Sequence, residues 1–254
     1  MRLRNTLLDF IEVAAWSKLR QSQCVVVSES IIKGPFSGMS VRSLTRTFLV
    51  FVLSICAMQA TLRADNSGVE FEEGLHYHRI VPAIPVPSGS GEVVVLELFW
   101  YGCPHCYSFE KHLSSWEQNK ADHVKFVRMP VALNRSWIPH ARMYYALEKM
   151  GEVDRMHSLI FEALHVQGRR LRDVESVSRF LSQHNIDTDE FEEAYNSSYV
   201  EEKMRHSGQF VRDSHASSVP TVIVNGKYRS TASAAGGHDL LLQLTDELVQ
   251  RETE

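Results

Sequence analysis

Cysteine is scarce in this sequence: the 254 residues contain four, at Cys24, Cys56, Cys103 and Cys106. Small disulfide-stapled proteins spread their cysteines through the fold, and this chain does not. It also lacks a polybasic tract and an acidic tail, and its net charge is only −4. Because nucleic-acid binding depends on clustered basic side chains, we expect no nucleic-acid partner.

The sequence also lacks an unbroken apolar run of about 20 residues, the length that a membrane-spanning helix needs. The longest apolar stretch, 48–58, follows Arg42 and Arg46 and precedes small and polar residues. This order is typical of a signal peptide, so we expect residues 39–64 to direct export. A retained membrane anchor is the alternative.

Residues 1–38 do not fit this arrangement, because a signal peptide begins close to its positive flank. Met39 stands directly before that flank. We therefore interpret residues 1–38 as a non-native extension and Met39 as the true start of translation. A genuine N-terminal extension is the alternative, and the N-terminal sequence of the precursor would distinguish the two.

The rest of the chain has the pattern of an α/β protein. A first strand is expected over 71–80, and apolar runs of strand length follow at 93–100, 124–131 and 219–224. A return strand is expected to begin at 227–229. Asn225-Gly226 between the last two strands predicts a hairpin turn. Helical spacing predicts helices over 107–120, 141–150, 155–164, 173–184, 189–206 and 238–251.

Cys103-Pro104-His105-Cys106 stands where the strong apolar strand passes into a helix. Two cysteines three positions apart can close a disulfide there, and the helix N-terminus favours an anion at Cys103. A stabilised thiolate has a low pKa and makes the disulfide form oxidising. Pro104 suits the first helical turn, and His105 can offer the Cys103 thiolate a hydrogen bond or a positive charge.

Two other uses of this cysteine pair are weaker. A zinc site needs four ligands, and the sequence has no second Cys-x-x-Cys; His105 and His112 would be unusual ligands. A structural disulfide across four residues would constrain the unfolded chain little. We therefore predict catalytic redox chemistry, with no metal and no cofactor.

Two further residues leave alternatives open. Glu97 interrupts the apolar strand, either as a solvated edge residue or as a buried carboxylate beneath the disulfide, where burial would raise its pKa. In the second case it could relay a proton during exchange. Pro220 is either an edge-strand proline or, with Val219, a cis peptide facing the disulfide and a substrate chain.

Residues 96–110, with Cys103 and Cys106, closely resemble the active-site segment of the DsbA family of thiol:disulfide oxidants. The likeness continues through 218–220 and 224–228. It implies a thioredoxin fold with an inserted helical domain. The expected boundaries are 65–135 and 208–254 for the two parts of the thioredoxin domain and 136–207 for the insert.

The resemblance also implies roles for residues and partners. Cys103 would form the mixed disulfide, Cys106 would resolve it, and Val219-Pro220 would be the cis pair. The implied partners are unfolded exported proteins with free thiols and a DsbB-like quinone-linked membrane oxidase, with the protein itself a monomer. The family often pairs the buried glutamate with lysine, but Arg128 stands at the matching position, and arginine does not readily release its proton.

The leading hypothesis is thus a periplasmic oxidoreductase that introduces disulfides into exported proteins. A disulfide reductase or isomerase of the same fold is one alternative. A redox-inactive, chaperone-like binding module is another, and the intact Cys103-Pro104-His105-Cys106 segment argues against it.

Overall fold

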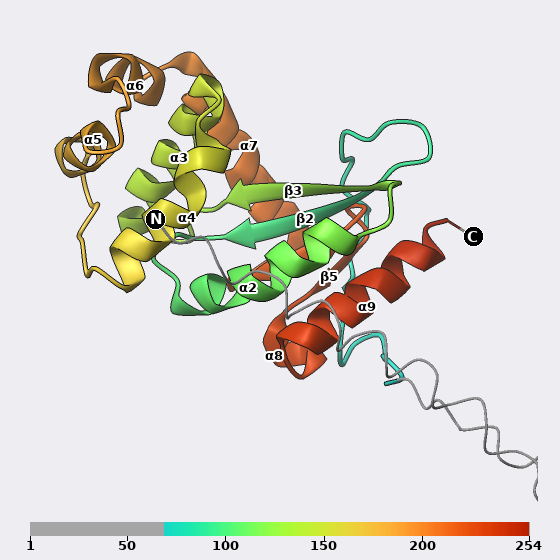
Figure 1. Ribbon diagram of the computed structural model, residues 1–254. Helices are drawn as coiled ribbons and strands as arrows, with labels where there is room; N and C mark the ends of the chain where they lie inside the picture. The colour runs from blue at the N-terminus through green and yellow to red at the C-terminus, as the bar shows by residue number, and fades with distance from the viewer. Residues whose placement is uncertain (1–68, 254) are drawn as a thin grey trace, which may run out of the picture. The chain divides into compact units, whose positions relative to one another are not determined.

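Figure 1 shows the computed structural model, which describes residues 69–253. The predicted extension 1–38, with the start at Met39, and the export segment 39–64 lie outside the described residues. No helix in the described part of the chain combines the length and the hydrophobicity needed to cross a lipid bilayer.

The described residues contain one five-stranded mixed sheet, in the order β1-β5-β4-β2-β3. The strands are β1 His78–Arg79, β2 Val93–Phe99, β3 Val124–Pro130, β4 Thr221–Val224 and β5 Tyr228–Ser230. β2 runs parallel to β3 and antiparallel to β4, and β5 and β1 extend the sheet with antiparallel pairing. The predicted α/β class is confirmed.

In the part of the chain that the structure describes, helices lie between the strands and after the last one, as the sequence predicted. Their bounds are α2 Pro104–Asn119, the 3-10 helix η1 Arg135–Trp137, α3 Ile138–Met150, α4 Val153–His165, α5 Val174–Ser182, α6 Thr188–Tyr195, α7 Ser198–Ser214, α8 Ala232–Ala235 and α9 His238–Arg251. Helices α3 to α7 form a block between β3 and β4. In Figure 1, α3 and α4 lie at the end of the sheet to which β2 and β3 point.

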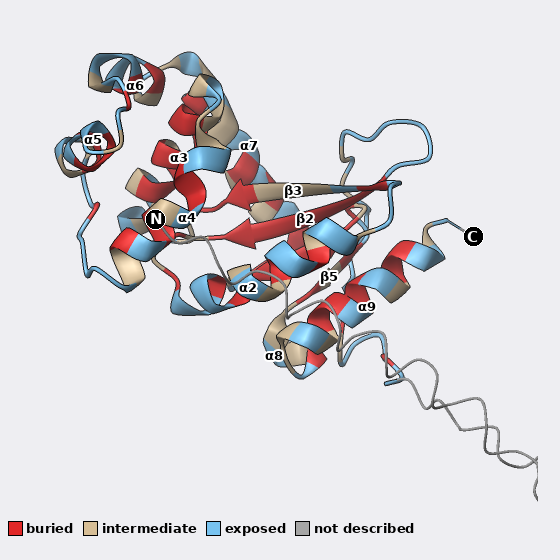
Figure 2. Cartoon of the chain, viewed as in Figure 1, coloured by how far each residue is buried: buried red, intermediate tan, exposed pale blue. Residues whose placement is uncertain are grey.

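Strand β2 is buried along its whole length, as Figure 2 shows. Successive side chains of a strand point to opposite faces of its sheet. Val93 and Val95 accordingly pack with residues of α2 and α9, whereas Leu96 and Leu98 pack with Phe210 of α7. The odd-numbered positions of β2 therefore face α2, the helix that starts at the cysteine pair.

The predicted hairpin at Asn225-Gly226 is confirmed. Both residues have positive φ, 51° and 66°, as the tight turn between β4 and β5 requires. Glycine is also needed here for space, because a Cβ at Gly226 would lie 1.9 Å from the carbonyl oxygen of Ile84.

The first predicted strand, 71–80, is wrong in extent, because only His78–Arg79 pairs as a strand. Upstream of it the chain turns at Gly74, whose φ is 89° and whose N–H donates to the Tyr77 carbonyl over 2.7 Å. The Glu-Glu-Gly sequence that ends in this glycine favours a turn over an extended strand.

The single helix predicted over 189–206 is two helices, α6 and α7. The break occurs at Ser197, whose side chain caps α7 by accepting a hydrogen bond from the Val200 N–H. Helix α7 then continues to Ser214, so the domain boundary expected at residue 207 falls inside a helix.

Candidate active site

The cysteine pair lies at the N-terminus of α2, as the sequence predicted. Cys103 is the N-cap residue, and its sulfur accepts a hydrogen bond from the Cys106 N–H over 3.4 Å. Pro104 occupies the first turn, where its missing N–H removes no helical hydrogen bond. Both cysteines are buried and unbonded, so the structure represents the dithiol form.

The two thiols have opposite acidities. The pKa of Cys103 is lowered from 9.0 to about 6, first by the hydrogen bond from the Cys106 thiol. Burial opposes this shift, and the N–H groups of Cys106 and His105 and the His105 charge add to it. Burial, followed by the hydrogen bond to Cys103, raises the pKa of Cys106 far above its ordinary value. Cys103 therefore carries the thiolate, and Cys106 keeps its proton.

His105 is exposed, and its charge contributes less to the low pKa of Cys103 than the Cys106 thiol does. From the sequence, His105 and the helix N-terminus were expected to lower the pKa of Cys103. In the structure, the Cys106 thiol lowers this pKa more than His105 does. The two residues between the cysteines allow both the thiol and the N–H of Cys106 to reach the Cys103 sulfur.

The loop before β4 reaches the same sulfur from the other side. The Val219–Pro220 peptide bond is cis, which decides between the two interpretations of Pro220. When Cys103 is protonated, its thiol donates to the carbonyl oxygen of Val219, which lies 3.5 Å from the sulfur. Val219 is half-buried, so its backbone and the nucleophilic sulfur meet at the same edge of the molecule.

Glu97 is fully buried on the α2 side of β2, which excludes the solvated-edge alternative. Burial raises its pKa well above 4.5, and the negative charge of Glu110 adds to the rise. Neither carboxyl oxygen has a hydrogen-bond partner among the described residues. These conditions favour a neutral acid rather than a carboxylate beneath the cysteine pair.

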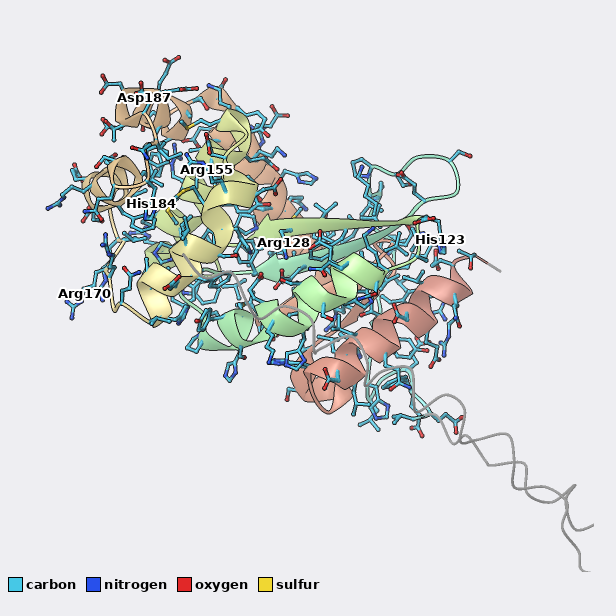
Figure 3. All side chains as sticks on the ribbon, in the orientation of Figure 1. His123, Arg128, Arg155, Arg170, His184 and Asp187 are labelled. Atoms are coloured by element: carbon cyan, nitrogen blue, oxygen red, sulfur yellow. The ribbon has the colours of Figure 1, made fainter. Side chains whose placement is uncertain are left out.

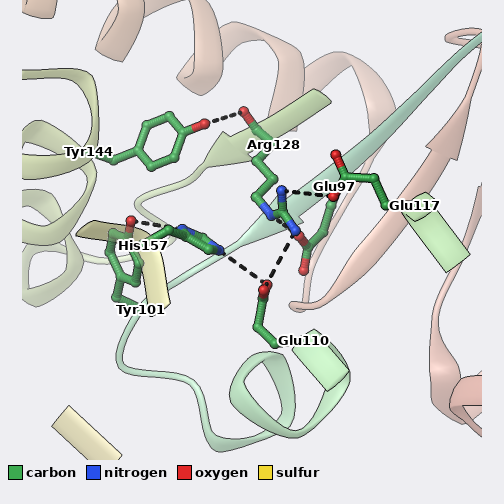
Figure 4. A network of polar contacts seen from close by, with 7 residues as sticks. All are labelled: Glu97, Tyr101, Glu110, Glu117, Arg128, Tyr144 and His157. Atoms are coloured by element: carbon green, nitrogen blue, oxygen red, sulfur yellow. Dashed lines mark hydrogen bonds and ion pairs between the residues drawn. The ribbon is translucent and has the colours of Figure 1, made fainter. Parts of the chain in front are cut away.

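Arg128 stands opposite Glu97 in the register of β2 and β3, and its Nε lies 3.7 Å from Glu97 Oε2. The guanidinium is shared, as Figure 4 shows: Nη2 lies 3.5 Å from Glu110, and Nη1 lies 3.4 Å from Glu117. These carboxylates raise the pKa of Arg128 although burial opposes the shift. One cation therefore serves three acidic side chains.

The sequence analysis missed both Glu110 and Glu117. Glu110 lies one helical turn after Cys106, so the period of α2 places the two on the same face. Burial would raise the pKa of Glu110, but contacts with His157 and Arg128 overcome it and leave the pKa lowered. The i, i+4 spacing from Cys106 was the signal that could have found this residue.

The helical block supplies a further neighbour, His157 of α4. Its Nε2 lies 3.2 Å from Glu110 Oε1, and its Nδ1 is 2.9 Å from the Tyr101 hydroxyl (Figure 4). Tyr101 is fully buried, and burial raises the pKa of its hydroxyl, which therefore stays neutral. No local pattern in the sequence connects position 157 with the cysteine pair.

A stacked pair of tryptophan side chains includes Trp100, whose ring lies against Gly102. Trp100 stacks on Trp137 of η1, with ring centroids 4.2 Å apart and planes 5° from parallel. A Cβ at Gly102 would lie 2.2 Å from the Trp100 ring, so only glycine fits directly before Cys103. The Trp100 ring also stacks on His140, with centroids 5.8 Å apart. Burial lowers the pKa of His140 to about 4, so its imidazole is neutral.

Comparisons with known proteins place this site in a family. A family model described as a DSBA-like thioredoxin domain matches residues 137–249. "Thiol:disulfide interchange protein DsbA" of Pseudomonas syringae pv. tomato is 35% identical over 181 residues, which cover 71% of this chain and 84% of that protein. The protein of the same name from Azotobacter vinelandii is 37% identical, covering 73% and 86%.

Solved structures agree. The crystal structure of Pseudomonas aeruginosa DsbA aligns with a TM-score of 0.68 at 36% identity, covering 72% of this chain and 94% of that one. The oxidoreductase DsbA from Xylella fastidiosa aligns with a TM-score of 0.66 at 29% identity, covering 70% and 95%.

A thioredoxin fold that carries a helical insertion, with a cysteine pair at the first turn of α2, defines a class of thiol:disulfide oxidoreductases. The expected fold and enzyme class are therefore confirmed. Within that class, this chain belongs to the DsbA family of thiol:disulfide interchange proteins.

Proposed function

We propose that the protein introduces disulfide bonds into exported proteins in the periplasm, with Cys103 as the residue that substrates attack. The observation that carries this proposal is the opposed acidity of the pair: the pKa of Cys103 is about 6, whereas that of Cys106 is raised. A stabilised Cys103 thiolate favours the dithiol form, and the disulfide form is then a strong oxidant.

The reaction begins with the Cys103–Cys106 disulfide. A substrate thiolate attacks the sulfur of Cys103, a new substrate–Cys103 disulfide forms, and the electrons of the broken bond leave on Cys106. A second substrate thiolate then attacks the substrate sulfur of this mixed disulfide. The substrate leaves with its disulfide, and Cys103 leaves as a thiolate, so two electrons have passed to the enzyme.

Glu97 supplies the proton that Cys106 takes up in the first step. Its carboxyl is buried on the α2 side of β2, and its raised pKa keeps a proton available. Arg128 does not relay that proton, since a guanidinium stays charged. It instead limits the rise in the pKa of Glu97, because its positive charge lowers that pKa.

Val219 and Pro220 form the substrate-binding edge. The Val219 carbonyl oxygen lies 3.5 Å from the Cys103 sulfur, so an extended substrate chain that pairs with this backbone would lie against the reacting sulfur. The proposal also divides the chain into a thioredoxin domain, built from 65–135 and 208–254, and an insert over 136–207. The protein is proposed to act as a monomer. Export would use the segment 39–64, and a DsbB-like quinone-linked membrane oxidase would restore the disulfide.

A paired assay tests this function. The oxidised protein is mixed with a reduced two-cysteine peptide, and separately the reduced protein is mixed with insulin. We expect fast peptide oxidation that Cys103→Ser abolishes. With insulin, the Cys103 thiolate of Cys106→Ser should attack an insulin disulfide and stay trapped as a mixed disulfide, because no second thiol resolves it. Peptide oxidation that survives Cys103→Ser would overturn the proposal, and insulin reduction faster than peptide oxidation would favour the reductase alternative.

A further inference from the structure

The last residue of α4, His165, contacts both flanks of the cysteine pair. Its Nε2 lies 2.7 Å from the backbone carbonyl oxygen of Tyr101. A carbonyl only accepts, so Nε2 carries the hydrogen and donates it. The same ring stacks on Tyr107, with centroids 4.8 Å apart and planes 7° from parallel.

These two contacts enclose the active-site turn. Tyr101 stands two residues before Cys103, and Tyr107 directly follows Cys106. Between them the turn is closed by short backbone hydrogen bonds, from the Cys103 N–H to the Trp100 carbonyl and from the Tyr107 N–H to the Cys103 carbonyl. A side chain from the helical block thus joins the strand side of the turn to its helix side.

Helix α4 holds Tyr101 at a second point. The buried Tyr101 hydroxyl is 2.9 Å from Nδ1 of His157, two helical turns before His165 on α4. The side chain of Tyr101 is therefore fixed by one histidine and its backbone by the other. Figure 4 shows the first of these contacts, where His157 also faces Glu110.

We propose that His165 is a positioning residue for thiol exchange: it ties both flanks of the cysteine pair to α4 and so sets how the N–H donors at the start of α2 face the Cys103 sulfur. The inference rests on the proposed function for its significance in catalysis. The geometry that it concerns is present in the dithiol form without any substrate.

Loss of the His165 contacts would change the hydrogen bonds that reach the Cys103 sulfur. The Cys106 N–H donates to the Cys103 sulfur over 3.4 Å, and the Val219 carbonyl lies 3.5 Å from the same sulfur. A small opening of the turn between Tyr101 and Tyr107 would weaken the donor contact, because hydrogen bonds weaken quickly with distance and angle. The thiolate would then lose part of its stabilisation.

Two substitutions separate the two contacts of His165. His165→Phe keeps a ring for stacking on Tyr107 but removes the donor to the Tyr101 carbonyl. His165→Gln keeps an N–H donor at the position of Nε2 but removes the ring. We expect His165→Phe to raise the pKa of Cys103 by about 0.5 to 1 unit, the size of one weakened hydrogen bond to a charged group. His165→Gln should restore most of that shift.

His184 provides the matched control. This histidine also contacts an aromatic ring, Phe180, at 4.7 Å, and its carbonyl accepts from Arg155 within the helical block. Figure 3 labels Arg155 and His184 in that block, away from α2. His184→Phe makes the same chemical change, and we expect it to leave the pKa of Cys103 unchanged even where it lowers the melting temperature.

The measurement is the ultraviolet absorbance of the Cys103 thiolate over a pH titration, with the reduction potential taken on the same samples. A shift in His165→Phe that His165→Gln restores supports the inference. It is overturned if His165→Phe melts earlier with an unchanged thiolate pKa, or if both His165 variants shift the pKa equally. Wild-type peptide oxidation is measured in parallel, so that failure of the proposed function is recorded separately.

A measurement on the unsubstituted protein covers the case in which His165→Phe does not fold. Nitrogen-15 NMR of the histidine rings reports which ring nitrogen carries the hydrogen. We expect Nε2 of His165 to be protonated and slow to exchange in the reduced protein. An unprotonated Nε2, or one that exchanges as fast as the exposed ring of His105, would overturn the inference.

Discussion

Glu97 and Arg128 stand directly opposite each other on β2 and β3, yet their closest charged atoms are 3.7 Å apart. The guanidinium contacts Glu97, Glu110 and Glu117, so its positive charge is shared by three acids. Glu97 is the most buried of the three. The pair is therefore best understood as a neutral acid beside a shared cation.

The first prediction concerns Glu97→Gln and stability. An acid whose folded pKa is raised above its unfolded value of 4.5 binds more protons when folded, so stability falls as pH rises from 4.5 towards the folded pKa. The neutral amide removes this dependence. We expect Glu97→Gln to stabilise the reduced protein at pH 8 and to change its stability little at pH 4.

Urea unfolding of the reduced protein at both pH values measures this difference. Glu117→Gln is the control, because Glu117 contacts the same guanidinium but is much more exposed than Glu97. Equal stability of Glu97→Gln and the unsubstituted protein across the pH range would contradict a raised pKa at Glu97. Thiol exchange should nevertheless slow in Glu97→Gln, because the amide has no proton to give to Cys106.

The second prediction concerns Glu110→Gln. Removing this charge takes away a repulsion that raises the pKa of Glu97. It also leaves the positive charge of Arg128 shared with one fewer acid. Both effects lower the pKa of Glu97. We expect the pH at which thiol exchange changes rate to move down. Carbon-13 NMR of the Glu97 carboxyl checks this directly, and an unmoved or raised midpoint would count against the shared-cation account.

The third prediction concerns His105→Gly. The backbone N–H and the charge of His105 both lower the pKa of Cys103, and the glycine variant keeps the N–H. We therefore expect the pKa to rise from about 6, but by less than a unit, since the larger contribution comes from the Cys106 thiol. Thiolate absorbance measures it. Cys106→Ser should raise the pKa further than His105→Gly, and the reverse order would refute this ranking.

Much of the fold was predictable because local chemistry decides it. The apolar run of β2, interrupted only by Glu97, favoured a buried strand, and Asn225-Gly226 favoured a tight turn. Position in the sequence also placed Cys103 at a helix start. The break at Ser197 was missed because one capping hydrogen bond, rather than hydrophobic spacing, divides α6 from α7.

The surroundings of the site were less predictable, because they are made by packing between distant segments. The family resemblance placed Arg128 at the position of the lysine that pairs with the buried glutamate, but left open whether Arg128 pairs with Glu97. Its sharing among three acids depends on the orientation of α2 against the sheet. His157 and His165 reach the site only because α4 folds back onto the cysteine turn. Hydrophobic periodicity contains no information on such contacts.

The reduction potential of the Cys103–Cys106 pair tests the central claim most directly. The claim is that a Cys103 pKa of about 6 beside a protonated Cys106 makes the disulfide a strong oxidant. Equilibration with glutathione buffers measures the potential. We predict a value well above about −180 mV, so that ordinary protein dithiols are oxidised. A value near about −270 mV, typical of thioredoxin, would contradict the claim and indicate a reductant.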